Sequence, residues 1–179
     1  MHHKDCPKSS AVRVFLSSSM QHGSDRDLRK ALRAFLDRFD LYECQIIERV
    51  SDTNGITDEC RERVEYADII LLVLEVDLRP GVKDEYYFAR QLGKEIFPFY
   101  RPAGANEELR SFVEYEVYPT ASSGSATCCS FSSYDELLDL IESNLLQHLT
   151  RDYRTYLQQK AHKRLEQTGI GGAPGTVER

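Results

Sequence analysis

The segment 68–94 constrains the fold of this chain more than any other part of the sequence. It begins with an unbroken apolar run, 69–74, which is typical of a central parallel strand because helices cover both of its faces. A Pro-Gly pair at 80–81 follows, and then a segment of helical periodicity at 82–92. The sequence therefore predicts a buried strand, a loop and a helix, the unit from which parallel α/β sheets are built.

Strand-like and helical segments alternate along the rest of the chain. The predicted strands span 12–16, 41–48, 69–74, 95–101 and 127–131. The predicted helices span 24–39, 57–66, 82–92, 107–113 and a long stretch from 133 onward. This alternation indicates an α/β fold with a doubly wound, mainly parallel five-stranded sheet of flavodoxin-like order 2-1-3-4-5. Helices are expected on both faces, with a long helix at the C-terminal end.

The length and composition favour one domain. A chain of 179 residues has room for a single full hydrophobic core. We expect one α/β nucleotide- or nucleoside-binding domain at 12–165, after a loose N-terminus at 1–11. The glycine-rich end of the chain, 166–179, is predicted to be a disordered tail because it offers little apolar surface to bury.

Charge and residue usage exclude several classes of function. The formal net charge of −6 argues against a nucleic-acid binder with a basic surface. No apolar run approaches the ~20 residues that span a bilayer, and the N-terminus lacks the apolar core of a signal peptide. The five cysteines and five histidines show no metal-ligand spacing. We therefore expect a cytoplasmic protein with no metal, no cofactor, no membrane contact and no nucleic-acid partner.

The predicted strand order selects two loops as a candidate site. The order reverses between the first and third strands, and open α/β sheets bind ligands at that point, outside the carboxyl ends of the strands. The loops 17–24 and 76–81 meet there. Ser17, Ser18 and Ser19 offer hydroxyl and backbone N–H groups to a phosphate or a ribose. The same serines could equally complete a turn.

Glu85 is the leading candidate for chemistry. It lies in the first turn of the predicted helix 82–92 and shares a helical stripe with Ala89 and Leu92. A helix N-terminus favours the ionised carboxylate and opposes the rise in pKa that burial causes. Such a carboxylate is suited to attack the anomeric carbon of a sugar, or to stabilise a cationic one. The alternative is an ordinary acid at the start of a helix.

Three charged neighbours complete the candidate site. Asp84 projects about 100° away from Glu85 around the helix and is expected to face solvent. Asp77, in the preceding loop, could hydrogen-bond a ribose hydroxyl or polarise the glutamate. Arg79 could meet a phosphate, or be a solvated loop residue.

A family resemblance rests on three segments: VFLSSS at 14–19, ADIILLVL at 67–74 and PGVKDEYYFARQLGK at 80–94. They resemble the nucleoside 2-deoxyribosyltransferase superfamily and its TIR-like relatives, which include domains found in signalling NTPases. In the transferases a glycine precedes the pattern Glu-x-Gly-Tyr-Ala, whose glutamate is the nucleophile. The matching positions in this sequence are Gly81, Glu85, Phe88 and Ala89.

The resemblance implies an enzyme that cleaves or transfers the N-glycosidic bond of NAD, a nucleotide or a nucleoside. Glu85 would be the nucleophile or the oxocarbenium stabiliser, with NAD a substrate rather than a cofactor. A third option is transfer of a different sugar phosphate.

A rival hypothesis is a non-catalytic TIR-like signalling module for nucleotide sensing or protein–protein contact. Val82 and Tyr87 favour it, because they stand where the transferases have threonine and glycine and so suggest a filled pocket. The superfamily also implies a homo-oligomer, for which the long helix could present Leu146, Tyr156 or Leu157.

Overall fold

The computed structural model describes residues 11–18, 23–39, 41–45, 58–119 and 128–167. The chain divides into two units, Met1–Leu140 and Ile141–Arg179. Most of the loose N-terminus and of the disordered tail expected from the sequence lies outside the described residues, as does Ser19. The expectations for these segments, and for a single domain at 12–165, stay predictions.

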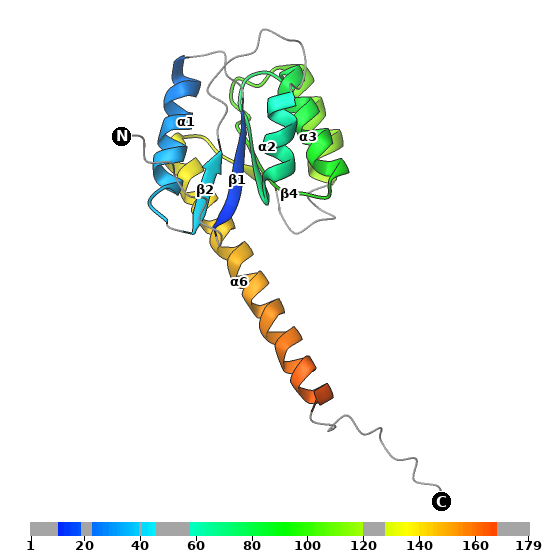
Figure 1. Cartoon of the computed structure of the whole chain (residues 1–179). Coiled ribbons are helices and arrows are strands. Elements are labelled where there is room, and N and C mark those ends of the chain that lie inside the picture. Colours follow the sequence, from blue (N-terminus) through cyan, green and yellow to red (C-terminus); the bar gives the residue numbers. More distant parts are fainter. Residues whose placement is uncertain (1–10, 19–22, 40, 46–57, 120–127, 168–179) are drawn as a thin grey trace, which may run out of the picture. The chain divides into compact units, whose positions relative to one another are not determined.

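Within the described residues, the first unit is built on a five-stranded parallel sheet (Figure 1). Its strands are β1 (Val12–Ser18), β2 (Tyr42–Gln45), β3 (Ile69–Leu74), β4 (Glu95–Tyr100) and β5 (Cys129–Ser130). They pair in the order β2-β1-β3-β4-β5, each parallel to its neighbour, so the predicted order is confirmed. All six residues of β3 are buried, which explains why its sequence is apolar without alternation.

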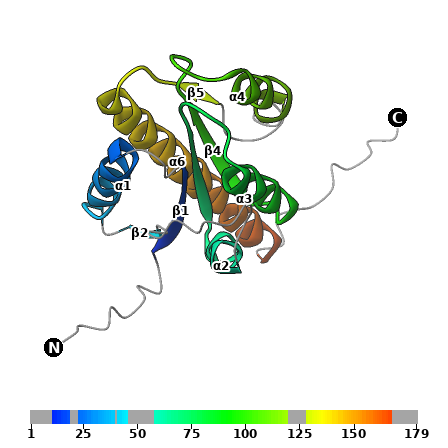
Figure 2. The ribbon, with the colours of Figure 1, turned by 90° about the horizontal axis from the view of Figure 1, so that it is seen from above.

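Helices lie on both faces of the sheet, as predicted. The helical elements are α1 (Gly23–Leu36), α2 (Asp58–Tyr66), α3 (Pro80–Gln91), α4 (Glu107–Phe112), the π-helix η1 (Val113–Val117) and α6 (Tyr134–Gln167). Helix α1 lies on one face, and α2, α3 and α4 lie on the other (Figure 2). The residues Leu28, Leu32 and Leu36, four apart, bury one side of α1.

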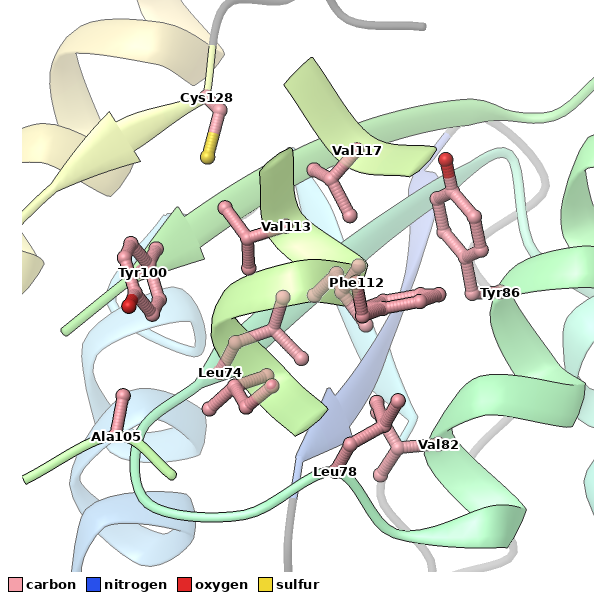
Figure 3. Close-up of a cluster of buried hydrophobic side chains, with 12 residues drawn as sticks. Leu74, Leu78, Val82, Tyr86, Tyr100, Ala105, Phe112, Val113, Val117 and Cys128 are labelled. Atoms are coloured by element: carbon pink, nitrogen blue, oxygen red, sulfur yellow. The ribbon is translucent and has the colours of Figure 1, made fainter. Parts of the chain in front are cut away.

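A cluster of buried side chains joins α3, α4 and η1 to the sheet (Figure 3). Leu72 and Leu74 of β3 contribute to it, with Val82 and Tyr86 of α3 and Phe112 of α4. Apolar contact drives this packing, and the Tyr86 hydroxyl donates a hydrogen bond of 2.9 Å to the carbonyl oxygen of Glu116, so its polar end is satisfied. The cluster holds α3 at a fixed position on the sheet.

Helix α3 begins earlier than the sequence predicted. It starts at Pro80 rather than Val82. The φ of proline suits the first helical position, and its missing N–H costs nothing there because the first N–H groups of a helix have no intrahelical partner. Its first turn therefore holds no acid. Glu85 lies in the second turn, so the prediction that it belongs to the first turn is wrong. At the other end Gly93, just after the helix, has φ of +66°, a left-handed conformation that glycine adopts without steric cost.

The long C-terminal helix is confirmed as α6, which has 34 residues. Its start is capped by the side chains of its flanking residues. The Glu136 N–H donates to Ser133 Oγ over 3.2 Å, and the Glu136 carboxylate accepts bonds from the N–H and hydroxyl of Ser132 at 2.8 and 2.6 Å. These bonds lower the pKa of Glu136. No helix in the described part of the chain combines the length and apolarity needed to cross a membrane.

Because β3 is buried along its whole length, truncating one of its side chains should destabilise the fold. Leu71→Ala removes a fully buried side chain, so we expect the free energy of unfolding to fall by about 3 kcal/mol in urea titrations. Leu41→Ala is the matched control, because 57% of Leu41 is exposed, and it should change stability by less than about 0.5 kcal/mol. Equal losses in the two variants would contradict the assignment of the core.

Candidate functional site

The two neighbouring serines at the end of β1 point to opposite faces of the sheet. The sequence placed Ser17 and Ser18 in a loop, but both belong to β1, where they pair with Leu72 and Val73 of β3. The prediction of a loop from 17 was therefore wrong, because pairing with β3 extends the strand. Side chains alternate along a strand, so Ser17 points toward the face of α3 and Ser18 toward the face of α1.

Ser17 contacts Glu85 on the face of the sheet that α3 covers. The Ser17 hydroxyl donates a hydrogen bond of 2.5 Å to Oε2 of Glu85, and both residues are buried. Glu85 is only 8% exposed. The two positions are 68 residues apart in sequence and become neighbours only through the parallel order of the strands. The structure thus brings together the first predicted serine and the leading predicted carboxyl group.

Burial dominates the electrostatics of Glu85. Loss of hydration raises the pKa of its carboxyl group, while hydrogen bonds from Ser17 and Cys60 and the positive charge of Arg29 act in the opposite direction. The expectation that the helix N-terminus would hold the carboxylate ionised is not met, because Glu85 lies beyond the first turn, where the macrodipole acts most strongly. The net effect is that the Glu85 carboxyl group holds its proton more tightly than an exposed glutamate does.

Ser18 is held by an arginine that the sequence reading did not select. Arg29, in α1, donates from Nε to Ser18 Oγ over 2.8 Å and from Nη2 to the Ser18 carbonyl oxygen over 2.9 Å. Arg29 is buried, and a buried guanidinium beside a strand end supplies positive charge to the carboxyl edge of the sheet. A basic residue on the buried side of α1 was the signal that could have identified it.

Asp77 and Arg79 form an ion pair within their own loop. Arg79 Nη2 lies 2.6 Å from Asp77 Oδ2, and about a quarter to a third of each side chain is exposed. Among the described residues, the other carboxylate oxygen of Asp77, Oδ1, is buried and has no hydrogen-bond partner. An acceptor of this kind is suited to a hydroxyl donor such as that of a ribose.

The remaining predicted residues lie near this loop. Gly81 is the second residue of α3, and Asp84 immediately precedes Glu85. Both are partly exposed, so the expectation that Asp84 faces solvent is met only in part. The negative charge of Asp84 contributes to the raised pKa of Glu85.

Two further charged residues at the same edge were missed. Glu75 follows β3 and Arg101 follows β4, and Arg101 Nη1 lies 3.4 Å from Glu75 Oε1. Glu75 is buried, and Arg101 Nε is buried without a hydrogen-bond partner in the described part of the chain. Their positions directly after two central strands were a usable signal, because parallel strands end at one edge.

Val82 and Tyr87 both pack against apolar side chains of the first unit. Val82 packs in the cluster with Leu72 and Leu74. Tyr87 is two residues from Glu85, about 200° around the helix, and its ring packs edge-on against Phe112 while remaining 38% exposed. The Tyr87 ring is therefore directed to another side of α3 than Glu85, whereas Val82, three residues before Glu85, lies on a neighbouring side of the helix.

No group of three or more His, Cys, Asp or Glu side chains among the described residues could hold a metal ion. The described side chains at this edge include a buried carboxyl group with a hydroxyl donor, a second carboxylate with an oxygen that has no partner among the described residues, and arginines that could face an anion.

Comparison with known proteins supports the fold. The sequence matches no protein-family model and no curated protein. The structure is similar to a CMP N-glycosidase, BcmB, from Clostridium botulinum, with a TM-score of 0.51 and 18% sequence identity, over 73% of this chain and 98% of that one. A conserved protein from Enterococcus faecalis V583 aligns with a TM-score of 0.47 and 12% identity, over 74% of this chain and 98% of the other.

At 18% identity the likeness to BcmB shows a shared fold. Both the glycosidase and the TIR-like sides of the family resemblance stay predictions.

The raised pKa of Glu85 predicts how stability depends on pH. The folded chain holds the Glu85 proton more tightly than the unfolded chain, so this contribution is fully present below the ordinary glutamate pKa and is lost as pH rises through the folded value. The free energy of unfolding of the wild type should therefore fall relative to that of Glu85→Gln across this window.

Urea titrations at a series of pH values measure the difference. Glu108→Gln is the matched control, since Glu108 is exposed on α4. The difference in the free energy of unfolding between wild type and Glu108→Gln should not change with pH. A difference between wild type and Glu85→Gln that is level or rises with pH would contradict the burial argument.

Proposed function

We propose that this protein cleaves or transfers the N-glycosidic bond of a nucleotide, a nucleoside or NAD at the carboxyl edge of its sheet. The observation that carries the proposal is the buried Glu85 carboxyl group, hydrogen-bonded by Ser17, at the point where the strand order reverses. A perturbed carboxyl group in such a position is a candidate for catalysis.

Two independent lines support this assignment. The strand order alone selects the edge at which Ser17 and Glu85 meet. The resemblance to the deoxyribosyltransferases places their nucleophile at the same residue, and the fold is shared with a CMP N-glycosidase. The first line rests on topology and the second on sequence pattern, so their agreement on Glu85 favours the enzyme.

The proposed reaction uses the ionised carboxylate. A Glu85 oxygen forms a bond to the anomeric carbon as the bond from that carbon to the base nitrogen breaks, and the base leaves with the bonding electron pair. A base that leaves as an anion takes a proton from water, whereas nicotinamide leaves neutral. Water or an acceptor base then displaces Glu85 from the sugar. In the variant without a covalent bond, the carboxylate stabilises the oxocarbenium ion and water attacks directly.

Neighbouring residues would hold the substrate. The free oxygen of Asp77 would accept a ribose hydroxyl, and Ser18 and Arg79 would meet a phosphate. Gly81 at the start of α3 would let the backbone approach the ligand closely. Ser19 and Asp84 are proposed as further ligand contacts. The Arg101 guanidinium at the same edge favours an anionic substrate, and so a nucleotide over a free nucleoside.

The second candidate is a non-catalytic module that binds a nucleotide or another protein. The burial of Glu85 favours it, because a carboxyl group 8% exposed and hydrogen-bonded to a serine is also what a structural buried acid looks like. A sensor would bind the nucleotide without consuming it.

The deciding experiment measures release of free base. Wild type, Glu85→Gln and the control Glu108→Gln are incubated with CMP, with NAD and with a panel of nucleosides, and the products are separated by chromatography. We expect wild type and Glu108→Gln to release a base, and Glu85→Gln to be slower by at least about 10³-fold, because the amide is not a nucleophile. Circular dichroism checks that each variant is folded.

Base release by Glu85→Gln at the wild-type rate would overturn the role of Glu85. Binding of CMP or NAD by wild type without release of base, detected by calorimetry, would favour the sensor.

The Ser17 hydrogen bond predicts a shift in the pH dependence of turnover. Only the ionised carboxylate reacts, so kcat/KM should fall as pH drops through the Glu85 pKa. The Ser17 hydroxyl stabilises the charged form, so Ser17→Ala should raise the Glu85 pKa further and move the acid limb of the kcat/KM profile to higher pH. An acid limb that stays in place, or moves to lower pH, would show that Ser17 does not act on Glu85.

A further inference from the structure

An exposed apolar stripe runs along the second unit. Leu146, Tyr153, Tyr156 and Leu157 of α6 are exposed by 54, 62, 54 and 44%, and Leu149 is partly exposed between them. At 100° per residue these five side chains fall within an arc of about 100° on one side of the helix. Apolar stripes of this width on soluble proteins are normally covered by another surface.

The opposite side of the same helix is polar and satisfied by its own residues. His148 Nδ1 lies 2.5 Å from Arg151 Nη2, and His148 Nε2 lies 3.3 Å from Asp152 Oδ2. The Thr155 hydroxyl donates to the Arg151 carbonyl oxygen over 3.0 Å. Between Leu146 and Leu157 the helix is therefore apolar on one side and polar on the other, and the stripe is the side suited to a partner.

Charges of opposite sign flank the stripe along the helix. Glu142 lies one turn before Leu146 in line with the stripe, and Lys160 and Arg164 follow it on the same line. The Lys160 ammonium lies 5.7 Å from the centre of the Tyr156 ring, which places its charge at the end of the apolar surface. The stripe is thus acidic at its N-terminal end, apolar in the middle and basic at its C-terminal end.

We propose that two copies of this chain pair through this stripe with their α6 helices antiparallel. A two-fold axis at the level of residues 151 and 152, midway along the stripe, packs each apolar segment on its copy and brings Glu142 of one chain beside Lys160 of the other. A parallel pair would instead oppose like charges at both ends. The surface is complementary to itself only in the antiparallel arrangement, as an isologous dimer interface requires.

The first test is the mass of the full chain in solution, measured by sedimentation equilibrium at micromolar concentrations. We expect a reversible dimer. Tyr153→Glu places a charge in the middle of the stripe and should raise the dissociation constant at least about tenfold. Thr155→Glu, which adds the same charge on the polar side two residues away, should leave it within about threefold. A monomer at every concentration, or equal effects of the two variants, would overturn the proposal.

A charge exchange tests the orientation. In the antiparallel pair Glu142→Lys opposes two cations and weakens the dimer, and adding Lys160→Glu in the same chain restores it, since each charge again meets its opposite. A parallel pair keeps like charges opposed in both variants, so the second change would restore nothing. Failure of the double variant to recover the wild-type dissociation constant would exclude the antiparallel arrangement. Circular dichroism confirms that α6 is retained in each variant.

Discussion

The register of β1 on β3 is the constraint on which the candidate site depends. Because Ser17 pairs with Leu72 and Ser18 with Val73, the two serines face opposite sides of the sheet, one toward Glu85 and the other toward Arg29. A shift of one residue would exchange the two faces and break both contacts. The strand pairing that builds the core therefore also fixes the chemistry of its carboxyl edge.

The proposed enzyme requires a carboxylate in a place that penalises its charge. Burial of Glu85 disfavours ionisation, and Ser17, Cys60 and Arg29 recover part of the lost stabilisation. A nucleophile held in this way loses its charge as it bonds to the sugar, so the cost of burial is relieved along the reaction. A fully solvated carboxylate carries no such burial cost, so its bonding to the sugar would bring no comparable relief.

The sequence predicted the architecture well and the site only in outline. The apolar run of β3 and the alternation of elements were sufficient for the sheet order, and topology selected the edge that holds Glu85. The start of α3 and the end of β1 were misplaced, because a helix-compatible proline and pairing with β3 decided them. Cys60, Glu75 and Arg101 were missed, since each acquires its partner only when separate strand and helix units come together. Arg29 was missed although its partner Ser18 lies only 11 residues away, because its side chain is on the buried side of α1.

A crystal structure of the Glu85→Gln chain with CMP would test the central claim most directly. The proposal predicts that the ribose lies at the carboxyl edge of the sheet, with its anomeric carbon within about 3.5 Å of the residue 85 side chain, as in a complex ready to react. CMP bound with that carbon remote from residue 85 and beside another side chain would contradict it.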